Sequence, residues 1–269
     1  MGEKNSYLKD EIIYDDIIYI DEEKNQAVLY KVDEGLQFGI GFFETILIRE
    51  KAYFLKEHLQ RLNNSLKKFG LENYVPFEAV EKLIQARSLK NTALKIIATE
   101  KNIFAMTRPI SYNLETYQKG RKVTISNVIK SSHSKLLTHK TLNFGENILE
   151  LRKAKESGFD DCLFLNEKGH ITESAVANLF IIYKDKILTP PVSDGLLPGI
   201  IRQKVIENFT VYEEHITKEQ LKSSQGGFLT NSLLGVAAIS YVEDVKMPIH
   251  PLCTEVAKFF GEMIPQNGT

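Results

Sequence analysis

Lys140 is the first residue whose surroundings could support chemistry. It stands in residues 138–144, directly before a helix predicted to begin at Asn147. A lysine amine can attack a carbonyl carbon as a nucleophile, and it can carry a proton. On composition alone, a solvated lysine at a helix entrance is the simpler interpretation, so the choice depends on the rest of the chain.

Three other features could take part in chemistry. Glu173 lies in residues 169–180 and could be no more than an exposed acid at a strand end. A helix predicted after Pro198-Gly199 would offer its first backbone amides to an anion, because these amides lack partners inside the helix. Arg61 lies just off an apolar helix stripe, so both a surface arginine and an anion ligand fit its position.

Several familiar motifs are absent from the sequence. Gly39-Ile40-Gly41 is followed by Glu44 where a dinucleotide motif would need a third glycine, and there is no Walker sequence. The six histidines form no HExxH pair, so no metal is expected unless tertiary contacts build a site. No G-x-S-x-G elbow supports a hydrolase.

The composition indicates a folded protein of the cytoplasm. The 269 residues are 43% hydrophobic and 26% charged, and 34 basic residues against 35 acidic ones give a net charge of −1. This balance favours neither nucleic acid nor an anionic membrane as a partner. Two cysteines exclude a disulfide scaffold, and no apolar run is long enough for a transmembrane helix or a signal peptide.

The hydrophobic pattern predicts the elements that must position these residues. Leu55, Leu59, Leu62, Leu66 and Phe69 recur at helical spacing, and Gly70 would end that helix. Further helices are expected around 80–87, over 147–156 and from about 199. Strands are expected at 12–14, 17–20, 27–32, 93–99, 103–107, 123–129, 162–165, 179–183 and 187–189, with an apolar run at 228–239.

This order of elements predicts two domains. A smaller α+β domain would span residues 1–112, and a larger domain carrying Lys140 would span 121–269. Residues 113–120 have no clear period and are predicted to be the linker. The expected fold class is therefore mixed, α+β and α/β, in two domains.

Taken together, the motifs resemble fold-type IV enzymes that depend on pyridoxal 5'-phosphate, the class of D-amino acid and branched-chain aminotransferases and aminodeoxychorismate lyases. The similar segments are residues 36–44, 57–62, 138–144, 169–180, 188–191, 196–202 and 228–236. They occur in the family's order over nearly the whole chain. The resemblance implies the two-domain fold of the D-amino acid aminotransferases.

The resemblance also implies a role for each residue. Lys140 would bind the cofactor aldehyde and move protons, and Glu173 would keep the pyridine nitrogen protonated. Arg61 and the amides of Ile200 and Ile201 would bind the phosphate. Many relatives have threonine at the position of Ile201, so one hydroxyl contact would be lost. Asn231 and Ser232 match the remaining cofactor positions, with Ser232 as a hydroxyl donor to the phosphate.

Local features favour aminodeoxychorismate lyase within the class. Two residues separate Lys140 from Asn143, as in the lyases and D-amino acid enzymes, whereas branched-chain enzymes have a longer insertion. Phe43 stands where the D-amino acid enzymes have tyrosine, and Glu100-Lys101 stands where they have arginine and glycine. Residues 230–235 resemble the lyase segment most. The product pair would be 4-aminobenzoate and pyruvate, as in folate biosynthesis.

Two alternatives to the lyase remain. An aminotransferase acting on D-amino or branched-chain amino acids would share every cofactor residue. A catalytically silent relative would have no need of the full residue set. For the carboxylates of a small amine substrate, Lys101 and Arg108 are weak candidates. The class further implies a homodimer, with the active site between the two domains and a loop of the partner subunit closing it.

Overall fold

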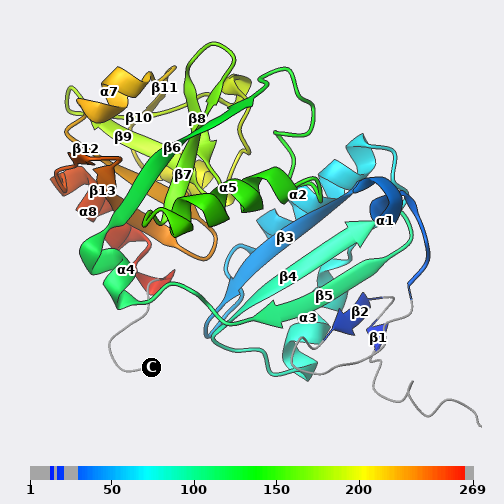
Figure 1. Cartoon of the computed structure of the whole chain (residues 1–269). Helices are drawn as coiled ribbons and strands as arrows, with labels where there is room; N and C mark the ends of the chain where they lie inside the picture. The colour runs from blue at the N-terminus through cyan, green and yellow to red at the C-terminus, as the bar shows by residue number, and fades with distance from the viewer. Residues whose placement is uncertain (1–12, 15–16, 21–29, 264–269) are drawn as a thin grey trace, which may run out of the picture. The chain divides into compact units, whose positions relative to one another are not determined.

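The computed structural model describes residues 13–14, 17–20 and 30–263, and it divides the chain into two compact units (Figure 1). Unit 1 comprises residues 1–110 together with Lys140–Asn143. Unit 2 comprises Ser111–His139 and Phe144–Thr269. Each unit has a mixed sheet and its own hydrophobic core.

Unit 1 is built on a five-stranded sheet in the order β1-β2-β5-β4-β3. Strand β4 pairs antiparallel with both β3 and β5, and β2 joins β5 in parallel. Its strands and helices are β1 (Ile13–Tyr14), β2 (Ile17–Ile20), α1 (Glu34–Phe38), β3 (Gly41–Ile48), α2 (Leu55–Lys68), α3 (Phe77–Ala86), β4 (Thr92–Thr99) and β5 (Ile103–Arg108).

The core of unit 1 lies between this sheet and the helices α2 and α3 (Figure 1). The predicted leucine stripe is confirmed: Leu55, Leu59, Leu62 and Leu66 are all buried in α2. They pack against alternate residues of β3 and β4, because successive strand residues point to opposite faces of a sheet. The stripe therefore decides which face of α2 meets the sheet.

Unit 2 contains a larger sheet in the order β11-β10-β9-β12-β13-β6-β7-β8. Strand β8 also pairs with β9, so among the described residues β9, β12, β13, β6, β7 and β8 close a ring. The strands are β6 (Arg121–Lys130), β7 (Asp161–Asn166), β8 (Ile171–Ser174), β9 (Asn178–Tyr183), β10 (Lys186–Thr189), β11 (Val211–Glu213), β12 (Gly226–Asn231), β13 (Gly235–Val242) and β14 (Val245–Lys246).

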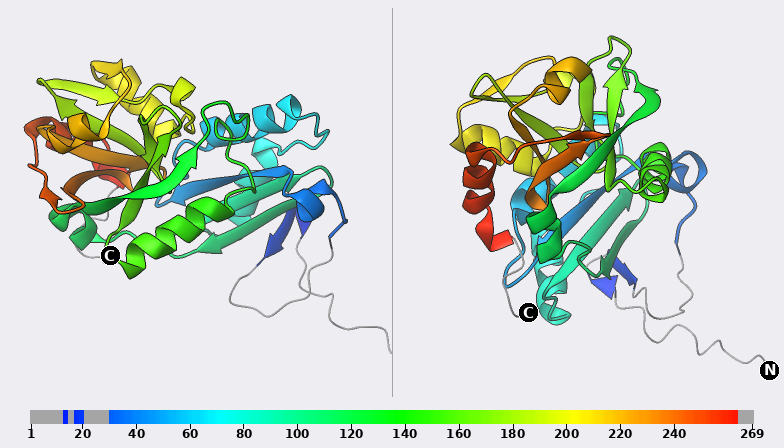
Figure 2. Two further views of the ribbon diagram at one scale, coloured as in Figure 1. Left: turned by 45° about the horizontal axis from the view of Figure 1, so that its top comes forward. Right: turned by 60° about the vertical axis from the view of Figure 1, so that its left-hand side comes forward.

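Helices lie outside the curved strands of unit 2 (Figure 2). Helix α5 packs on β6 and β7, α6 packs on β12, and α8 packs on β12 and β13. The helical segments are α4 (Leu114–Lys119), α5 (Gly145–Glu156), η2 (Val192–Asp194), α6 (Ile200–Asn208), α7 (Lys218–Lys222), α8 (Pro251–Phe259) and η3 (Gly261–Met263).

The structure corrects three expectations drawn from the sequence. The predicted linker 113–120 contains α4, which Asn113 and Thr116 begin with a capping box. Lys140 belongs to unit 1 by its contacts, although it was assigned to the second domain. Helix α1 and strand β3 were not predicted. The strand expected at 27–32 falls largely outside the described residues, and residues 30–32 are not in a strand.

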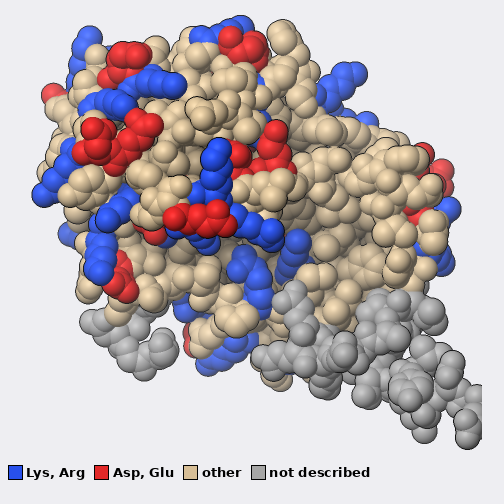
Figure 3. Space-filling view, viewed as in Figure 1, with Lys and Arg blue, Asp and Glu red and all other residues tan. Residues whose placement is uncertain are grey.

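The surface agrees with the balanced charge. On the face shown in Figure 3, acidic and basic side chains are intermingled over the left-hand part of the view. Within residues 13–14, 17–20 and 30–263, no helix has the length and hydropathy needed to cross a membrane.

Candidate functional site

The segment that carries Lys140 runs alongside strand β3. The amide of Phe43 donates to the carbonyl of Lys140 at 2.8 Å, and the amide of Leu142 donates to the carbonyl of Gly41 at 2.9 Å. Thr141 forms a β-bridge with Phe42 between them. Lys140 is therefore held by strand-like pairing, which fixes its backbone far better than a free loop would.

The side chain of Lys140 reaches the ring of Phe43, with Nζ 4.4 Å from the ring centroid. Lys95 of β4 approaches the same ring, with its Nζ at 4.7 Å. Both lysines are half-buried. One aromatic ring thus has two ammonium groups near it, an arrangement that favours a bound anion.

Strand β3 and helix α2 share a buried ionic cluster. The guanidinium of Arg61 donates from Nε and Nη2 to the two carboxylate oxygens of Glu44, at 2.7 Å each. Nδ1 of His58 lies 2.6 Å from Glu44. Glu44 is buried on the core face of β3, and Arg61 is 16% exposed. Arg61 is consequently an anchored residue of α2 and not a free surface arginine.

The charges in this cluster shift its titration. Burial raises the pKa of Glu44, but the positive charge of Arg61 and then that of His58 outweigh it and lower the pKa to about 2. Burial lowers the pKa of His58, the carboxylate of Glu44 opposes this, and the charges of Arg61 and Lys140 lower it further. Glu44 therefore stays ionised, and it fixes the plane of the Arg61 guanidinium.

In unit 2, Glu173 is held at both carboxylate oxygens. Nδ2 of Asn178 donates to Oε2 at 3.0 Å, and the amide of Leu197 donates to Oε1 at 3.2 Å. Asn178 also donates to the carbonyl of Leu197 at 2.8 Å. The carboxylate is ionisable, oriented and half-buried, as a partner for a protonated ring nitrogen must be.

A second carboxylate supports the turn that follows Glu173. Asp161 is buried and accepts hydrogen bonds from the amides of Cys162 and Ala175 and from the hydroxyl of Ser174. Burial raises its pKa to about 6, although these hydrogen bonds and the charge of Arg121 oppose the shift. Asp161 therefore stabilises the backbone at the end of β8, directly after Glu173.

Helix α6 begins at Gly199, beside Asn178. A Cβ atom at Gly199 would lie 2.0 Å from Oδ1 of Asn178, so glycine is needed for this close approach. The side chains of Ile200 and Ile201 are buried, and only their backbone amides remain for a ligand. The first amides of a helix carry its positive dipole end, which suits a phosphate.

The loop after β12 contains Asn231 and Ser232. Asn231 is occupied within the protein: its Oδ1 accepts from the amides of Leu233 and Leu234, and its Nδ2 donates to Tyr112 and to the carbonyl of Val176. Its side chain thus shapes the loop. Ser232 is half-buried, and its role as a phosphate donor stays a prediction.

Thr230 was missed by the sequence analysis. Its Oγ1 is buried and has no hydrogen-bond partner among the described residues. Thr230 pairs with Asn178 across β12 and β9, so both side chains point to the same face of the sheet. A buried hydroxyl without a partner is costly, and a polar ligand beside Glu173 and Gly199 would satisfy it. Unit 2 therefore fits a polar cofactor group at this face.

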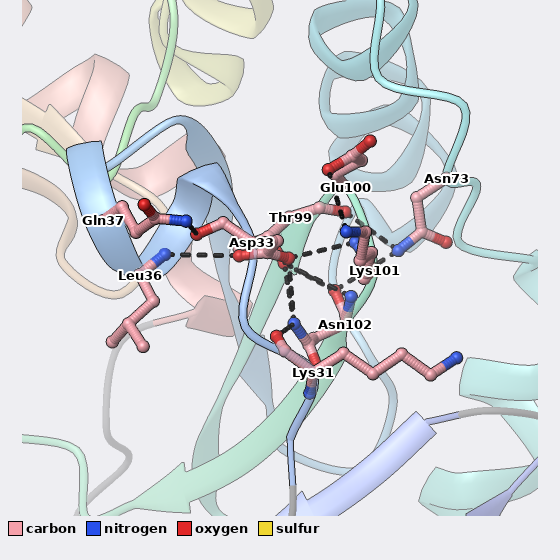
Figure 4. A network of polar contacts seen from close by, with 9 residues as sticks. All are labelled: Lys31, Asp33, Leu36, Gln37, Asn73, Thr99, Glu100, Lys101 and Asn102. Carbon is pink, nitrogen blue, oxygen red and sulfur yellow. Dashed lines mark hydrogen bonds and ion pairs between the residues drawn. The ribbon is translucent and has the colours of Figure 1, made fainter.

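The two candidates for substrate carboxylates are exposed. Lys101 lies in the turn between β4 and β5, and Arg108 ends β5. Figure 4 shows how this turn is fixed: the carboxylate of buried Asp33 accepts from the hydroxyl of Thr99, the amide of Lys101 and the side chain of Asn102. The carboxylate of Asp33 thus holds the turn. The side chain of Lys101 takes no part in these hydrogen bonds and is exposed.

The structure thus groups the predicted site residues by unit. Lys140 and Arg61 lie in unit 1, which also brings Glu44, His58 and Lys95 near them. Unit 2 carries the remaining predicted residues, which are Glu173, Ile200, Ile201, Asn231 and Ser232.

The chain is similar to known proteins over most of its length. The family model described as amino-transferase class IV matches residues 41–242. The aminodeoxychorismate lyase of Bacillus subtilis is 27% identical over 250 residues, covering 83% of this chain and 84% of the relative. The probable branched-chain-amino-acid aminotransferase of Rickettsia felis is 26% identical over 242 residues, covering 80% and 82%.

A solved structure shares the fold. A Legionella pneumophila protein named as a candidate 4-amino-4-deoxychorismate lyase has a TM-score of 0.78 and 27% identity, and the match covers 91% of this chain and 99% of that one. The expected mixed two-domain fold is confirmed.

Proposed function

Because the chain belongs to the class IV aminotransferase family, whose enzymes depend on pyridoxal 5'-phosphate, we propose that it is a 4-amino-4-deoxychorismate lyase releasing 4-aminobenzoate and pyruvate. The observation that carries the proposal is the ring of Phe43 against Nζ of Lys140. At this position the D-amino acid aminotransferases have tyrosine, so the ring that lies against Lys140 in this chain carries no phenolic hydroxyl.

The residues of both units fit the cofactor. Lys140 would hold its aldehyde carbon, and Glu173 would bind the ring nitrogen. Arg61, the first amides of α6 and the hydroxyls of Ser232 and Thr230 would hold the phosphate. When bound, the cofactor supplies an electron sink for the carbon that carries the substrate nitrogen.

Lys140 and Glu173 then perform complementary tasks. With the cofactor bound, the amine of Lys140 would take the ring proton from the carbon that bears the substrate nitrogen. Glu173 keeps a proton on the pyridine nitrogen through a charge-assisted hydrogen bond. As the C–O bond to the enolpyruvyl group breaks, the ring becomes aromatic, and the departing group gains a proton to become pyruvate.

We further propose that Lys95 binds a carboxylate of the substrate. Its ammonium group approaches the same ring as the ammonium of Lys140, and its stem is half-buried. A charged donor close to the reacting amine can orient a substrate anion, whereas the exposed side chains of Lys101 and Arg108 are solvated. Lys95 therefore replaces both as the favoured candidate.

The second candidate function is a class IV aminotransferase. It is favoured by the match to the Rickettsia felis protein, and it uses the same cofactor residues. The two reactions differ in their need for a second substrate. An aminotransferase must regenerate its cofactor with a 2-oxo acid, whereas a lyase needs no acceptor.

This difference defines the test. The enzyme is supplied with chorismate, glutamine and an aminodeoxychorismate synthase, without any 2-oxo acid. We expect 4-aminobenzoate and pyruvate in equal amounts, with the Lys140→Ala variant as the inactive control. The lyase proposal is wrong if no 4-aminobenzoate forms while D-alanine or a branched-chain amino acid turns over with 2-oxoglutarate. The aminotransferase function then takes its place.

A further inference from the structure

Three possible metal ligands meet in unit 2 at a place that the proposed reaction does not use. His170 ends the turn between β7 and β8, Asp194 ends η2, and His215 follows β11. Each offers a ligand atom, and these atoms all lie within 4.8 Å of one another. We propose that this His–Asp–His cluster binds one zinc ion.

The charge of Asp194 is the first argument. Its carboxylate is 1% exposed and lies 2.9 Å from Nδ1 of His215 and 3.5 Å from Nδ1 of His170. Within the described part of the chain, no lysine or arginine pairs with it. A positive partner stabilises a buried carboxylate, and a divalent cation bound between Asp194 and the two histidines would supply that charge beside the hydrogen bond to His215.

The state of His170 is the second argument. Its Nδ1 is buried and makes no hydrogen bond to any residue that the structure describes. A buried ring nitrogen without a hydrogen bond calls for another partner, and a metal ion held by the facing carboxylate would be one. It points toward the same carboxylate as Nδ1 of His215, so the two nitrogens converge.

The backbone holds the ligands in place before any ion binds. Oδ1 of Asn166 accepts from the amide of His170 at 3.0 Å, and its Nδ2 donates to the carbonyl of Asp194 at 3.3 Å. The residues that follow the two histidines are also joined, since the amide of Ile171 donates to the carbonyl of Ile216 at 2.7 Å. Three segments distant in sequence are thereby tied together, as a metal site requires.

The ligand types select the ion. Two imidazole nitrogens and one carboxylate oxygen suit zinc, whereas magnesium and calcium take oxygen ligands. Zinc–nitrogen bonds of about 2.0–2.1 Å require the ligand atoms to come closer together than they are. The two rings stack at 4.5 Å with an angle of 23°, so they must turn apart. His215, 55% exposed, has the freedom to do so and leaves room for a water ligand.

A bound ion would act on the cofactor-binding segment. Asp194 is followed closely by Leu197, whose amide and carbonyl bond to Glu173 and Asn178, and then by Gly199 at the start of α6. Joining Asp194 to the two histidines would limit the motion of this segment. Zinc is therefore expected to raise the melting temperature without contacting the reacting atoms.

The experiment uses tag-free holoenzyme that has been dialysed against a chelator. Zinc is titrated by calorimetry, and bound metal is counted by inductively coupled plasma mass spectrometry. We expect one ion per chain at pH 7.5. We also expect weaker binding at pH 5.5, because imidazoles must lose their protons to coordinate a metal.

Variants distinguish this site from adventitious binding. His215→Ala should weaken zinc binding by more than the ~10- to 100-fold that loss of an outer partner costs. His133→Ala is the matched control, since His133 is 84% exposed and pairs with Glu167 outside the cluster. Asp194→Asn, checked for folding by circular dichroism, should also lose the ion.

The proposal fails if the parent binds no stoichiometric zinc, or if His215→Ala and His133→Ala bind it equally. None of these readouts depends on lyase or aminotransferase turnover. A failure of the proposed function therefore leaves the zinc result intact, and the reverse also holds.

Discussion

The ring of Phe43 has two lysines near it, and we propose a different role for each. Lys140 is fixed by its backbone pairing with β3, whereas Lys95 extends from β4. The two ammonium groups are chemically alike. Their different backbone anchors give them different tasks.

We expect the cofactor to be attached to Lys140 alone. The loaded protein is reduced with borohydride, digested and analysed by mass spectrometry, and the modified peptide should contain Lys140 because an imine-forming amine must be held at a fixed place. Lys140→Arg should abolish labelling, while Lys95→Arg should leave it unchanged. A label on Lys95 in the parent protein would reverse the two assignments.

Lys95→Met should raise KM for the amine substrate by about 10- to 150-fold and change kcat less, because it removes a charge-assisted contact worth ~1.5–3 kcal/mol. Lys101→Met is the matched control on the exposed turn, and its KM should match that of the parent. Steady-state kinetics measure both values. Borohydride labelling of Lys140 should be equal in all three proteins, so an unchanged KM in Lys95→Met rules out the carboxylate role.

Single residues also show which site residues can be predicted from the sequence and which cannot. Lys140 and Glu173 could be proposed because their neighbours in sequence carry a recognisable pattern. Thr230 could not, since its signal is a buried hydroxyl without a partner, and that property exists only once β12 lies beside β9. Lys95 likewise acquires its significance from Phe43 on the adjacent strand.

At the scale of elements, the ion pair between Glu44 of β3 and Arg61 of α2 offers a sharp test of the proposed cofactor site. Arg61→Ala should weaken affinity for pyridoxal phosphate by ~10- to 150-fold, because a phosphate contact is worth ~1.5–3 kcal/mol. It should also lower the free energy of unfolding by about 3–5 kcal/mol, since Glu44 would stay buried without its guanidinium partner and with only His58 beside it.

The double variant Glu44→Gln/Arg61→Ala separates these two effects. It should recover much of the stability, because no unpaired charge is then buried, but it should not recover cofactor affinity. Apoprotein titration gives the affinity, and urea denaturation gives the stability. If Arg61→Ala binds the cofactor as tightly as the parent, Arg61 serves the fold only.

The elements themselves were predictable where the pattern was periodic. Helix α2 was found from its leucine spacing, but β3 was missed because its residues are almost all buried, with no alternation of polar and apolar positions. Helix α4 was taken for a linker although Asn113 and Thr116 form a capping box. A run of only six residues gives too short a period to detect.

At the scale of the whole molecule, Asp161 makes stability depend on pH. Its pKa is about 6 in the folded protein against an ordinary value of 3.8, so the folded state binds the proton more tightly. The contribution of Asp161 to the free energy of unfolding is complete below pH 4. It falls by about 3 kcal/mol as the pH rises through 6. Asp161→Asn should remove that decline and be more stable than the parent at pH 8.

Urea denaturation between pH 5 and 8 measures this dependence. The range avoids Glu44, whose low pKa makes stability rise with pH between about 2 and 4.5. Asp160→Asn is the control, because Asp160 is adjacent but partly exposed. Equal pH profiles for Asp161→Asn and the parent would mean that burial does not raise the pKa of Asp161 in the folded protein.

The whole-molecule features that escaped the sequence are those made by distant segments. His170, Asp194 and His215 have no metal-like spacing along the chain, and only the packing of a turn, the end of η2 and the end of β11 brings them together. The association of Lys140 with unit 1 was missed for the same reason, since residues 140–143 join β3 by a short backbone pairing.

The backbone pairing of residues 140–143 with β3 also limits where the gene can be divided between the two units. The chain leaves unit 1 after Ile110, returns for Lys140–Asn143, and leaves again at Phe144. A half-gene ending at residue 110 would encode β3 without Lys140, and its complement would encode Lys140 without that strand. Recombination at one breakpoint therefore cannot exchange either unit whole.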